Sequence, residues 1–566
     1  MKARIAAVLR ERAAWLVPLV VAAIAMVPAL YALRAQTFAI LGRDQGIFMF
    51  VAWALRHGER IYRDVHEING PLPHAYYAFM QALGGEDEHV FRVLDTTWLG
   101  LGYAFVGATL PRWVGLPVTR RTTAAWALAG LAVMGAQYTR YEWWHTAQRE
   151  GIYAVLVAAS LGCQAIAHTT RSRRTAIAAF AAASVLTTLP WFGKPPCALF
   201  GLLQVFVVLL DRRSIVASLR AVMVVAVASG LAVGASALGF VLAFEDLGAG
   251  LRLLAKVPQL HHTIWNETLL GAYRAYNNAP RLDWAMATTA AFLGAFFWLR
   301  LPRRSLLALV LPLGGLVVFA GQGKAFPYHL HMLTLGTAVT ELVLLASLVR
   351  ALERRHDVLV VVAGLAAGGL GFQAAEDALM SHGVRGGWAA AGATAELRTT
   401  RAYLDHFPWG DYFPADLREA GAYLDAQLLP DERIQTYGFD PYLLFFARRK
   451  SASPVIYNFE LNVDAALEGG PGARPSPELW TWLETYRDDA EALVLAHVQK
   501  APPAAFAIVD EAPFTHPRDG EVDFRAHCPQ LWAFMTARYV RSAAFGAVKV
   551  WLREDVATRA KERAPQ

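Results

Sequence analysis

Residues 42–95, GRDQGIFMFVAWALRHGERIYRDVHEINGPLPHAYYAFMQALGGEDEHVFRVLD, form the stretch on which the fold prediction depends. This stretch follows the first long apolar segment. It holds too many charges to cross a bilayer and too many aromatic and apolar residues to be a solvated loop. We therefore expect it to lie at a membrane surface, with interfacial helices within residues 45–90. The alternative is that these helices only pack against the rest of the protein.

The composition is that of a polytopic membrane protein. Of the 566 residues, 55% are hydrophobic and 17% are charged, and the mean hydropathy is +0.32. The formal net charge is +7, but Lys and Arg stand in short clusters between apolar segments, which is the pattern of topology determinants. We therefore predict no nucleic-acid partner. Cys528 is alone in the polar tail, so no disulfide framework is expected there.

About eleven apolar segments are predicted to be membrane helices, several of them with the help of flanking turns. They cover residues 13–33, 93–110, 122–137, 151–168, 175–190, 196–210, 221–244, 284–300, 305–320, 328–348 and 357–373. Basic clusters occupy every second loop, so these loops are predicted to lie on the same side of the membrane as the N-terminus. The clusters comprise Arg112, Arg120, Arg121, Arg171, Arg173, Arg174, Arg212, Arg213, Arg220, Arg300, Arg303, Arg304, Arg350, Arg354 and Arg355. The positive-inside rule then predicts a multi-pass protein of the bacterial inner membrane, with a cytoplasmic N-terminus and a periplasmic C-terminus.

A polar tail follows the last apolar segment. We expect a transmembrane domain over residues 1–373 and a soluble periplasmic α/β domain over residues 374–566. Within the tail, helical spacing occurs at 417–428 and 478–498, and short β-prone runs occur at 433–437, 506–509 and 548–552. Residues 469–477, GGPGARPSP, are predicted to form a flexible surface loop.

Two acidic residues are candidates for acid–base chemistry. Asp44 stands in LGRDQG, a few residues past the first apolar segment, where a partly buried carboxylate can be tuned towards the working pH. Its alternative role is a helix cap or a surface acid paired with Arg43. Glu150 follows Arg149 at the start of a predicted helix, whose N-terminus favours a carboxylate or a phosphate. Its alternative role is to stabilise the helix dipole.

Two lysines stand where the charge rule does not expect them. Lys194 in PWFGKPP and Lys324 in GQGKAFPYHLH each lie at the predicted periplasmic end of an apolar segment. A lysine ammonium, with His329 or His331 nearby, can neutralise a phosphate or diphosphate. The alternative is snorkelling to lipid phosphates. The two histidines are two residues apart and diverge on a helix, so we predict no metal site.

In their order and sidedness, these motifs resemble the polytopic glycosyltransferases of the C superfamily, which use lipid-phosphosugar donors and include protein O-mannosyltransferases and lipid A aminoarabinose transferases. Asp44 is similar to the acidic residue in the first external loop of that family. The other similar positions are Tyr62-Arg63-Asp64, the turn Gly70-Pro71-Leu72 up to Tyr77, Arg92, Arg149-Glu150, Lys194-Pro195 and the stretch from Gln322 to His329. Many members carry a Lys before the proline pair of the first loop, where this chain has Asn69-Gly70.

The resemblance implies an integral membrane glycosyltransferase that moves a sugar from a polyprenyl-phosphate carrier to an envelope glycan, lipid or protein acceptor. It implies Asp44 and Glu150 as catalytic residues. The substrate-binding residues that it implies are Arg43, Asp64, Glu67, Arg92, Arg149, Lys194, Lys324, Tyr328 and His329. No cofactor is implied, and a divalent-metal requirement stays open. A single displacement would invert the anomeric centre, because the sequence shows no nucleophile for a two-step route.

Two other function classes fit parts of the sequence. A transporter or flippase of lipid-linked sugars would place charges near the bilayer midplane and show related halves. In this chain the unexplained charges gather at one predicted face instead. A non-catalytic envelope scaffold would account for the polar tail but not for lysines at helix ends.

Overall fold

The computed structural model describes residues 2–141, 143–211, 219–264, 267–352, 357–380, 387–462, 476–513 and 518–563. Arg212, Arg213, Arg354 and Arg355 lie outside the described residues, as does most of the predicted loop 469–477. The chain divides into two compact units. The first comprises Met1–Ile40, Gly84–Leu238 and Thr268–Gly392, and the second comprises Leu41–Leu83, Gly239–Glu267 and Ala393–Gln566.

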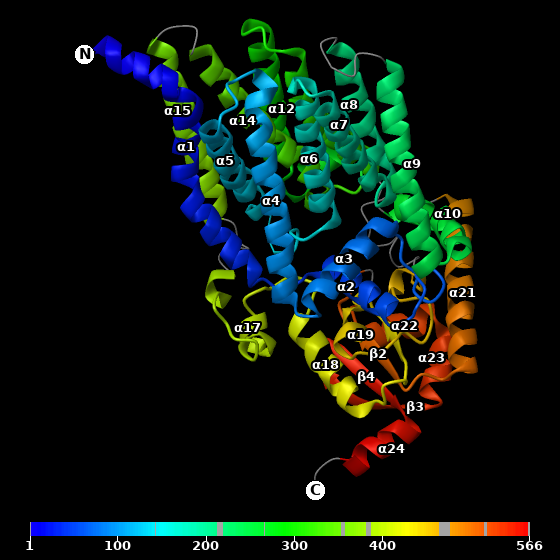
Figure 1. The fold of residues 1–566 in the computed structure, drawn as a ribbon. Coiled ribbons are helices and arrows are strands. Elements are labelled where there is room, and N and C mark those ends of the chain that lie inside the picture. The colour runs from blue at the N-terminus through cyan, green and yellow to red at the C-terminus, as the bar shows by residue number, and fades with distance from the viewer. Residues whose placement is uncertain are drawn as a thin grey trace. The chain divides into compact units, whose positions relative to one another are not determined.

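The first unit is helical. Its main helices are α1 (Lys2–Thr37), α4 (Glu88–Val114), α5 (Arg120–Thr139), α6 (Arg149–Thr169), α7 (Arg173–Thr188), α8 (Ala198–Leu210), α9 (Leu219–Phe244, which continues into the second unit), α11 (Leu269–Arg274), α12 (Ala279–Trp298), α13 (Val310–Gln322), α14 (His331–Leu352) and α15 (Asp357–Met380). Short 3-10 turns η1 (Leu189–Phe192), η2 (Pro195–Cys197), η4 (Arg303–Leu309) and η5 (Pro327–Leu330) connect some of them. Every predicted apolar segment falls on one of these elements (Figure 1).

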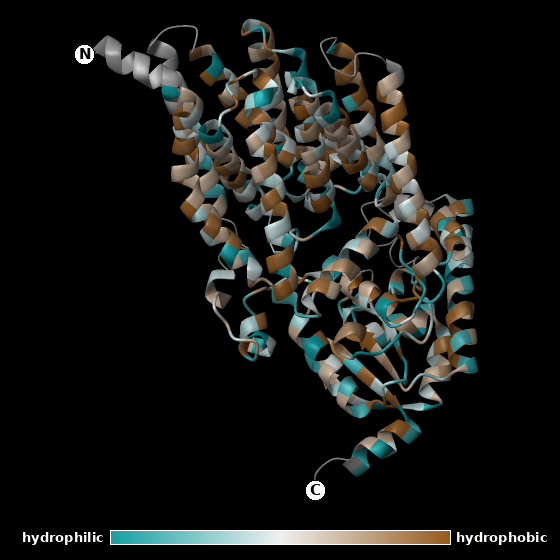
Figure 2. Cartoon of the chain, viewed as in Figure 1, coloured by the Kyte–Doolittle hydropathy of each residue, from teal (hydrophilic) through white to brown (hydrophobic). Residues whose placement is uncertain are grey.

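Six spans among the described residues are long and apolar enough to cross a membrane, judged by length and composition. They are Arg12–Thr37, Arg149–Thr169, Arg173–Phe192, Ala221–Phe244, Arg303–Gln322 and Pro327–Leu352. Figure 2 shows apolar residues along these helices. The predicted helical membrane-protein fold is confirmed. The number of crossings and the side of the membrane on which each loop lies stay predictions.

Small residues allow the helices of the first unit to pack closely. α4 packs against α5 and α6, and α1 packs against α5 and α15. A Cβ atom at Gly107 of α4 would lie 2.3 Å from the carbonyl oxygen of Trp126, and one at Gly130 of α5 would lie 2.7 Å from the Cα of Gly107. The two backbones therefore touch where these glycines meet, which is the usual way for membrane helices to gain contact without a hydrophobic driving force.

The second unit contains the sheet. Its strands are β1 (Ile434–Tyr437), β2 (Ala505–Val509), β3 (Tyr539–Phe545) and β4 (Val548–Arg553), in the order β1-β2-β4-β3. β1 and β2 are parallel, and the other two pairs are antiparallel. The helices of this unit are α2 (Arg43–Arg56), α3 (Pro71–Gly84), α10 (Leu247–Ile264), α17 (Arg401–Leu404), α18 (Pro414–Gln427), α19 (Tyr442–Phe446), α21 (Pro477–Lys500), α22 (Gly520–His527), α23 (Pro529–Thr536) and α24 (Glu554–Arg563).

The elements predicted in the tail correspond to α18, α21, β1, β2 and β4, so a C-terminal region of helices and strands is confirmed. The predicted domain boundary after residue 373 differs from the observed division. Leu41–Leu83 and Gly239–Glu267 belong with Ala393–Gln566, although both lie within residues 1–373, which were predicted to form the transmembrane domain. Two helices exist within the predicted stretch, α2 and α3, and their location at a membrane interface stays a prediction. α2 is buried over nearly its whole length and packs against α19, which favours protein packing over lipid contact for this helix.

Candidate functional site

A buried ion-pair cluster surrounds Lys194 in the first unit. Lys194 lies between η1 and η2, where proline-rich turns fix the backbone. Its Nζ donates to Glu150 Oε1 at 2.8 Å and to Gln322 Oε1 at 2.5 Å. Arg149 Nε donates to the same Glu150 oxygen at 3.1 Å, and His329 Nε2 lies 3.8 Å from it. We call Arg149, Glu150, Lys194, Gln322 and His329 the Lys194 cluster.

The Lys194 cluster holds its charges away from water. The side chain of Lys194 is 13% exposed and that of Glu150 is 2% exposed. Burial lowers the pKa of the Lys194 ammonium, and Glu150 only partly opposes this effect. An additional anion would therefore stabilise the charged form of this lysine. The alternative of snorkelling to lipid phosphates does not fit an ammonium that is bonded to Glu150 and Gln322.

Two atoms of the Lys194 cluster have unused hydrogen-bonding capacity. Within the described part of the chain, Glu150 Oε2 and His329 Nδ1 are buried and have no hydrogen-bond partner. Buried polar atoms of native proteins are nearly always paired, with protein, water or ligand. Glu150 Oε2 can accept a hydrogen bond from a ligand hydroxyl group, and His329 Nδ1 can donate or accept one according to its tautomer. Their position beside Lys194 would direct those groups to the same place as an anion.

The stretch from Gln322 to His329 surrounds the cluster. Gly323 ends α13 in the left-handed conformation (φ 60°), and half-buried Lys324 follows it. Lys324 is within electrostatic range of His329. The Tyr328 ring meets the His329 ring edge-on, with 4.5 Å between the centroids. The structure thus brings together six residues predicted from the sequence: Arg149, Glu150, Lys194, Lys324, Tyr328 and His329. Gln322 lay in the predicted motif but had been given no role.

Arg92 has a different environment. It is 1% exposed, and its guanidinium donates to Thr146 Oγ1 at 2.7 Å, to the Trp143 carbonyl at 2.9 Å and to the Ile40 carbonyl. These contacts join α4 to the end of α1 and to the loop before α6. They give Arg92 a structural role in the first unit, and the substrate contact implied by the resemblance stays a prediction.

Asp44 lies in the second unit, in the first turn of α2, and is half-buried. Its neighbour Arg43 is buried, with Nε 2.7 Å from Asp440 Oδ1 and Nη1 3.2 Å from Asp411 Oδ1. The two carboxylates outweigh the effect of burial and raise the pKa of Arg43 above its usual range. Arg43 therefore anchors the turn that carries Asp44. The substrate-binding role of Arg43 that the resemblance implies stays a prediction.

Glu67 is buried at the centre of a hydrogen-bond network. Its Oε2 accepts from the Asn69 backbone N–H at 3.0 Å and lies 2.8 Å from His74 Nε2. Its Oε1 accepts from Asn69 Nδ2 at 2.5 Å and from the Tyr457 hydroxyl at 3.4 Å. Asp64, by contrast, closes a local turn, because it accepts from the Arg60 backbone N–H at 2.8 Å and pairs with Arg63 at 2.6 Å.

His74 lies between two buried carboxylates. Its Nδ1 is 2.6 Å from Glu245 Oε1, opposite the contact with Glu67. Burial would lower the pKa of His74, but the hydrogen bonds and charges of Glu245 and Glu67 together raise it to about 9. No local pattern indicates this triad, because Glu245 is 171 residues away from His74 along the chain. The triad joins α3, the turn after Tyr62 and the end of α9.

The raised pKa of His74 predicts a pH-dependent stability. The ion pairs of the His74 imidazolium with Glu67 and Glu245 contribute their full stabilisation below the unfolded pKa of about 6.5. This stabilisation is lost as pH rises through about 9. We expect the gap in unfolding temperature between the wild type and His74→Gln to be largest near pH 6 and to narrow towards about pH 9.5. Thermal unfolding of the purified protein over this range measures it. His497→Gln, at an exposed position of α21, is the control. A gap that does not change with pH would contradict the assignment.

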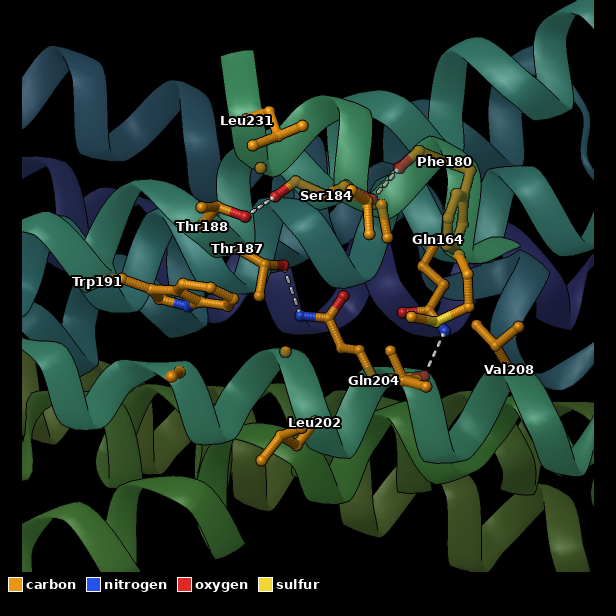
Figure 3. A pocket seen from close by; sticks show the side chains of 18 residues that line it. Gln164, Phe180, Ser184, Thr187, Thr188, Trp191, Leu202, Gln204, Val208 and Leu231 are labelled. Carbon is orange, nitrogen blue, oxygen red and sulfur yellow. Dashed lines mark hydrogen bonds between the residues drawn. The ribbon is translucent and has the colours of Figure 1, made fainter. Parts of the chain in front are cut away.

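An apolar cavity of about 450 Å³ lies in the first unit between α6, α7, α8 and α9 (Figure 3). Its polar side chains largely satisfy one another: Gln204 Nε2 donates to Thr187 Oγ1 at 2.7 Å, and Gln164 Nε2 donates to the Gln204 carbonyl at 3.2 Å. Trp191 and Ala198 both line the cavity, and Lys194 stands between them in the chain. The cavity therefore begins beside the segment that carries the ammonium.

No group of three or more His, Cys, Asp or Glu side chains suited to a metal ion occurs among the described residues. No family model matches the sequence, and no curated protein matches it.

Solved structures do match. The crystal structure of ArnT from Cupriavidus metallidurans bound to undecaprenyl phosphate is similar with a TM-score of 0.51 and 15% identity, over 96% of this chain and 98% of that one. The apo state of the same protein has a TM-score of 0.48 and 13% identity. At this identity the likeness of the first structure shows the fold. The chain therefore shares the fold of that ArnT structure, a helical membrane-protein fold with a C-terminal region that contains a sheet.

Proposed function

We propose that this protein is an integral membrane glycosyltransferase that takes a sugar from a polyprenyl-phosphate carrier. The Lys194 cluster is the observation that carries the proposal, because it gathers buried cations and unpaired polar atoms at helix ends. The shared fold supports it, since the similar ArnT structure was solved with undecaprenyl phosphate bound. The acceptor, a glycan, lipid or protein of the cell envelope, is proposed to lie on the periplasmic face.

The donor phosphate is proposed to bind Lys194, Arg149 and Lys324, with His329 beside them. Charge-assisted hydrogen bonds from such groups to phosphate oxygens are short and strong. A cavity with mostly apolar walls, lined by Trp191 and Ala198 on either side of Lys194 in the chain, suits the hydrocarbon chain of the carrier. Glu150 has one oxygen engaged by Lys194 and Arg149. Its proposed role is therefore to hold the cations in place, with Oε2 left for a sugar hydroxyl.

Asp44 is the proposed general base. Asp44 is half-buried in the first turn of α2, which Arg43 anchors through Asp440 and Asp411. Asp44 would take the proton of the acceptor hydroxyl as its oxygen bonds to the anomeric carbon. The bond from that carbon to the phosphate oxygen breaks, and the electron pair leaves with the phosphate. One displacement of this kind inverts the anomeric centre.

A transfer assay tests the proposal. Purified protein is incubated with undecaprenyl-phosphate-linked sugars and an envelope extract as acceptor, and release of undecaprenyl phosphate is measured. Release that depends on both the protein and the acceptor is the expected result. Binding of the carrier with no release from any sugar would contradict the enzyme and favour a transporter or flippase of the lipid.

Replacing Lys324 by Ala is expected to weaken use of the donor more than use of the acceptor. A charge-assisted contact with phosphate contributes about 1.5–3 kcal/mol, which corresponds to a tenfold to hundredfold loss in kcat/KM for the donor. Lys324→Arg should recover only part, because the guanidinium is wider and bonds in a fixed fork. The control is Arg121→Ala, an exposed position at the start of α5. Equal effects of Lys324→Ala and Arg121→Ala would mean that Lys324 does not bind the phosphate.

A further inference from the structure

The helix α10 of the second unit carries a stripe of exposed leucines. Leu247, Leu251 and Leu254 are 43%, 64% and 36% exposed. Their spacing along the sequence is i, i+4 and i+7, which places the three side chains on one face of the helix. Another face of the same helix is packed, because Leu253 and Leu260 are buried. α10 therefore rests on protein with one face and presents an apolar surface with the other.

The leucine stripe begins where an apolar span ends. The span Ala221–Phe244 of α9 is long and apolar enough to cross a membrane, and most of it is not buried in the protein. Leu242 and Phe244, at its end, are both exposed. The chain from Phe244 to Leu247 can reach at most about 11 Å. Where α9 crosses the bilayer, α10 therefore starts at the bilayer surface.

Two exposed cations accompany the leucine stripe. Arg252 and Lys256 are one helical turn apart, and around the helix they lie between the leucine face and the packed face. Lys256 Nζ is 6.0 Å from the centroid of the Tyr486 ring of α21. Leucines on one face with cations beside them are typical of a helix that lies in a membrane surface. The cations of such a helix stand at the level of the lipid phosphates and attract anionic lipids.

The start of α10 also holds the turn around Tyr62. The Asp246 N–H donates to the Ile61 carbonyl at 3.0 Å. A Cβ atom at Gly250 would lie 2.7 Å from the Tyr62 ring, so α10 packs directly on this ring. The Tyr62 hydroxyl in turn donates to the Asn69 carbonyl at 2.6 Å. The position of α10 therefore sets the position of this part of the first predicted external stretch.

We infer that α10 lies in the membrane surface, with its three exposed leucines among the outer acyl carbons and with Arg252 and Lys256 against the phosphate groups of anionic lipids. The lipid bilayer is the partner because the stripe continues from an apolar span and the charges beside it are positive. A second copy of the chain or another protein would instead cover the leucines with a dry contact. The inference does not depend on sugar transfer.

The first test measures the surroundings of position 251. Leu251→Cys is labelled with a nitroxide in the full-length protein, with one copy in each nanodisc of phosphatidylcholine and phosphatidylglycerol. Oxygen, which concentrates among acyl chains, is expected to relax this label more strongly than a water-soluble nickel chelate does. The wild type, whose three cysteines are buried, gives the background.

Val540→Cys is the control for this measurement. Val540 is also an exposed apolar residue of the second unit, and it belongs to β3, which lies far from α10 within that unit (Figure 1). Its label should respond more strongly to the nickel chelate than to oxygen. Equal responses at positions 251 and 540 would place α10 in water, and protection of position 251 from both reagents would mean that protein covers it. Either result would overturn the inference.

The second test addresses the two cations. Photoactivatable phosphatidylglycerol and phosphatidylcholine are compared in nanodiscs, and their crosslinks to the α10 peptide are counted by mass spectrometry. The wild type is expected to prefer phosphatidylglycerol about tenfold, because two cations near the surface attract the anionic lipid. Arg252→Gln/Lys256→Gln should lose most of this preference, and Arg252→Lys/Lys256→Arg, which keeps both charges, should retain it. An unchanged preference in the Gln variant would overturn the inference.

Discussion

Asp44→Asn is expected to lower kcat by about 10²–10⁴-fold, the usual contribution of general base catalysis. Asn keeps the shape of the side chain but cannot take the proton of the acceptor hydroxyl. The fold should persist, because the pairs of Arg43 with Asp440 and Asp411, which anchor this turn, stay in place. The loss of a negative charge from the first turn of α2 should cost no more than about 1 kcal/mol. Transfer kinetics and the unfolding temperature of the variant measure the two effects.

Asp555→Asn is the matched control for this prediction. Asp555 also lies in the first turn of a helix of the second unit, α24, and Arg553 engages its carboxylate at 2.6 Å. The hydrogen bond from Arg553 lowers the pKa of Asp555 below its usual value. Asp555→Asn should therefore leave kcat unchanged. A normal kcat for Asp44→Asn would move the base elsewhere, and Glu150→Gln is then the variant to measure.

Local pattern was enough to predict most of the helices. The apolar segments of the first unit coincide with helices because length and hydrophobicity alone specify a membrane-type helix. β3 was not predicted, since it is an edge strand whose residues Arg541 and Ser542 are exposed and break the alternation of a half-buried strand. α2 is apolar nearly all round, and such a pattern does not distinguish burial in lipid from burial in protein.

Part of the candidate site could also be predicted from local sequence pattern. Arg149, Glu150, Lys194 and His329 all stand at helix ends that topology assigned to one side, and the structure brings them together. The contacts that occupy Arg43 could not be predicted, because Asp440 lies 397 residues away and no local pattern links the two. The same holds for Glu245 with His74 and for Tyr457 with Glu67. Pairing over such distances is set by the tertiary fold, which one sequence does not display.

Lys194→Ala is expected to affect both stability and donor use. Removing one partner of a buried ion pair leaves the other without compensation, which costs about 3–5 kcal/mol in typical cases. The loss here should fall at the lower end, because Arg149 still donates to Glu150 at 3.1 Å. The use of an undecaprenyl-phosphate-linked sugar should fall tenfold to hundredfold, by the estimate of about 1.5–3 kcal/mol for one charge-assisted contact. Unfolding temperature and kcat/KM for the donor report the two losses separately.

The double variant Lys194→Ala/Glu150→Gln separates the structural role of Lys194 from its role in binding. Gln at position 150 carries no charge. The double variant therefore has no uncompensated buried carboxylate, and much of the stability lost in Lys194→Ala should return. Donor use should stay low, because the ammonium that is proposed to meet the phosphate is still absent. Recovery of both the stability and the donor use would mean that Lys194 serves only to neutralise Glu150. The phosphate would then have to be held by Lys324 and Arg149, and the effect of Lys324→Ala on the donor should exceed that of Lys194→Ala.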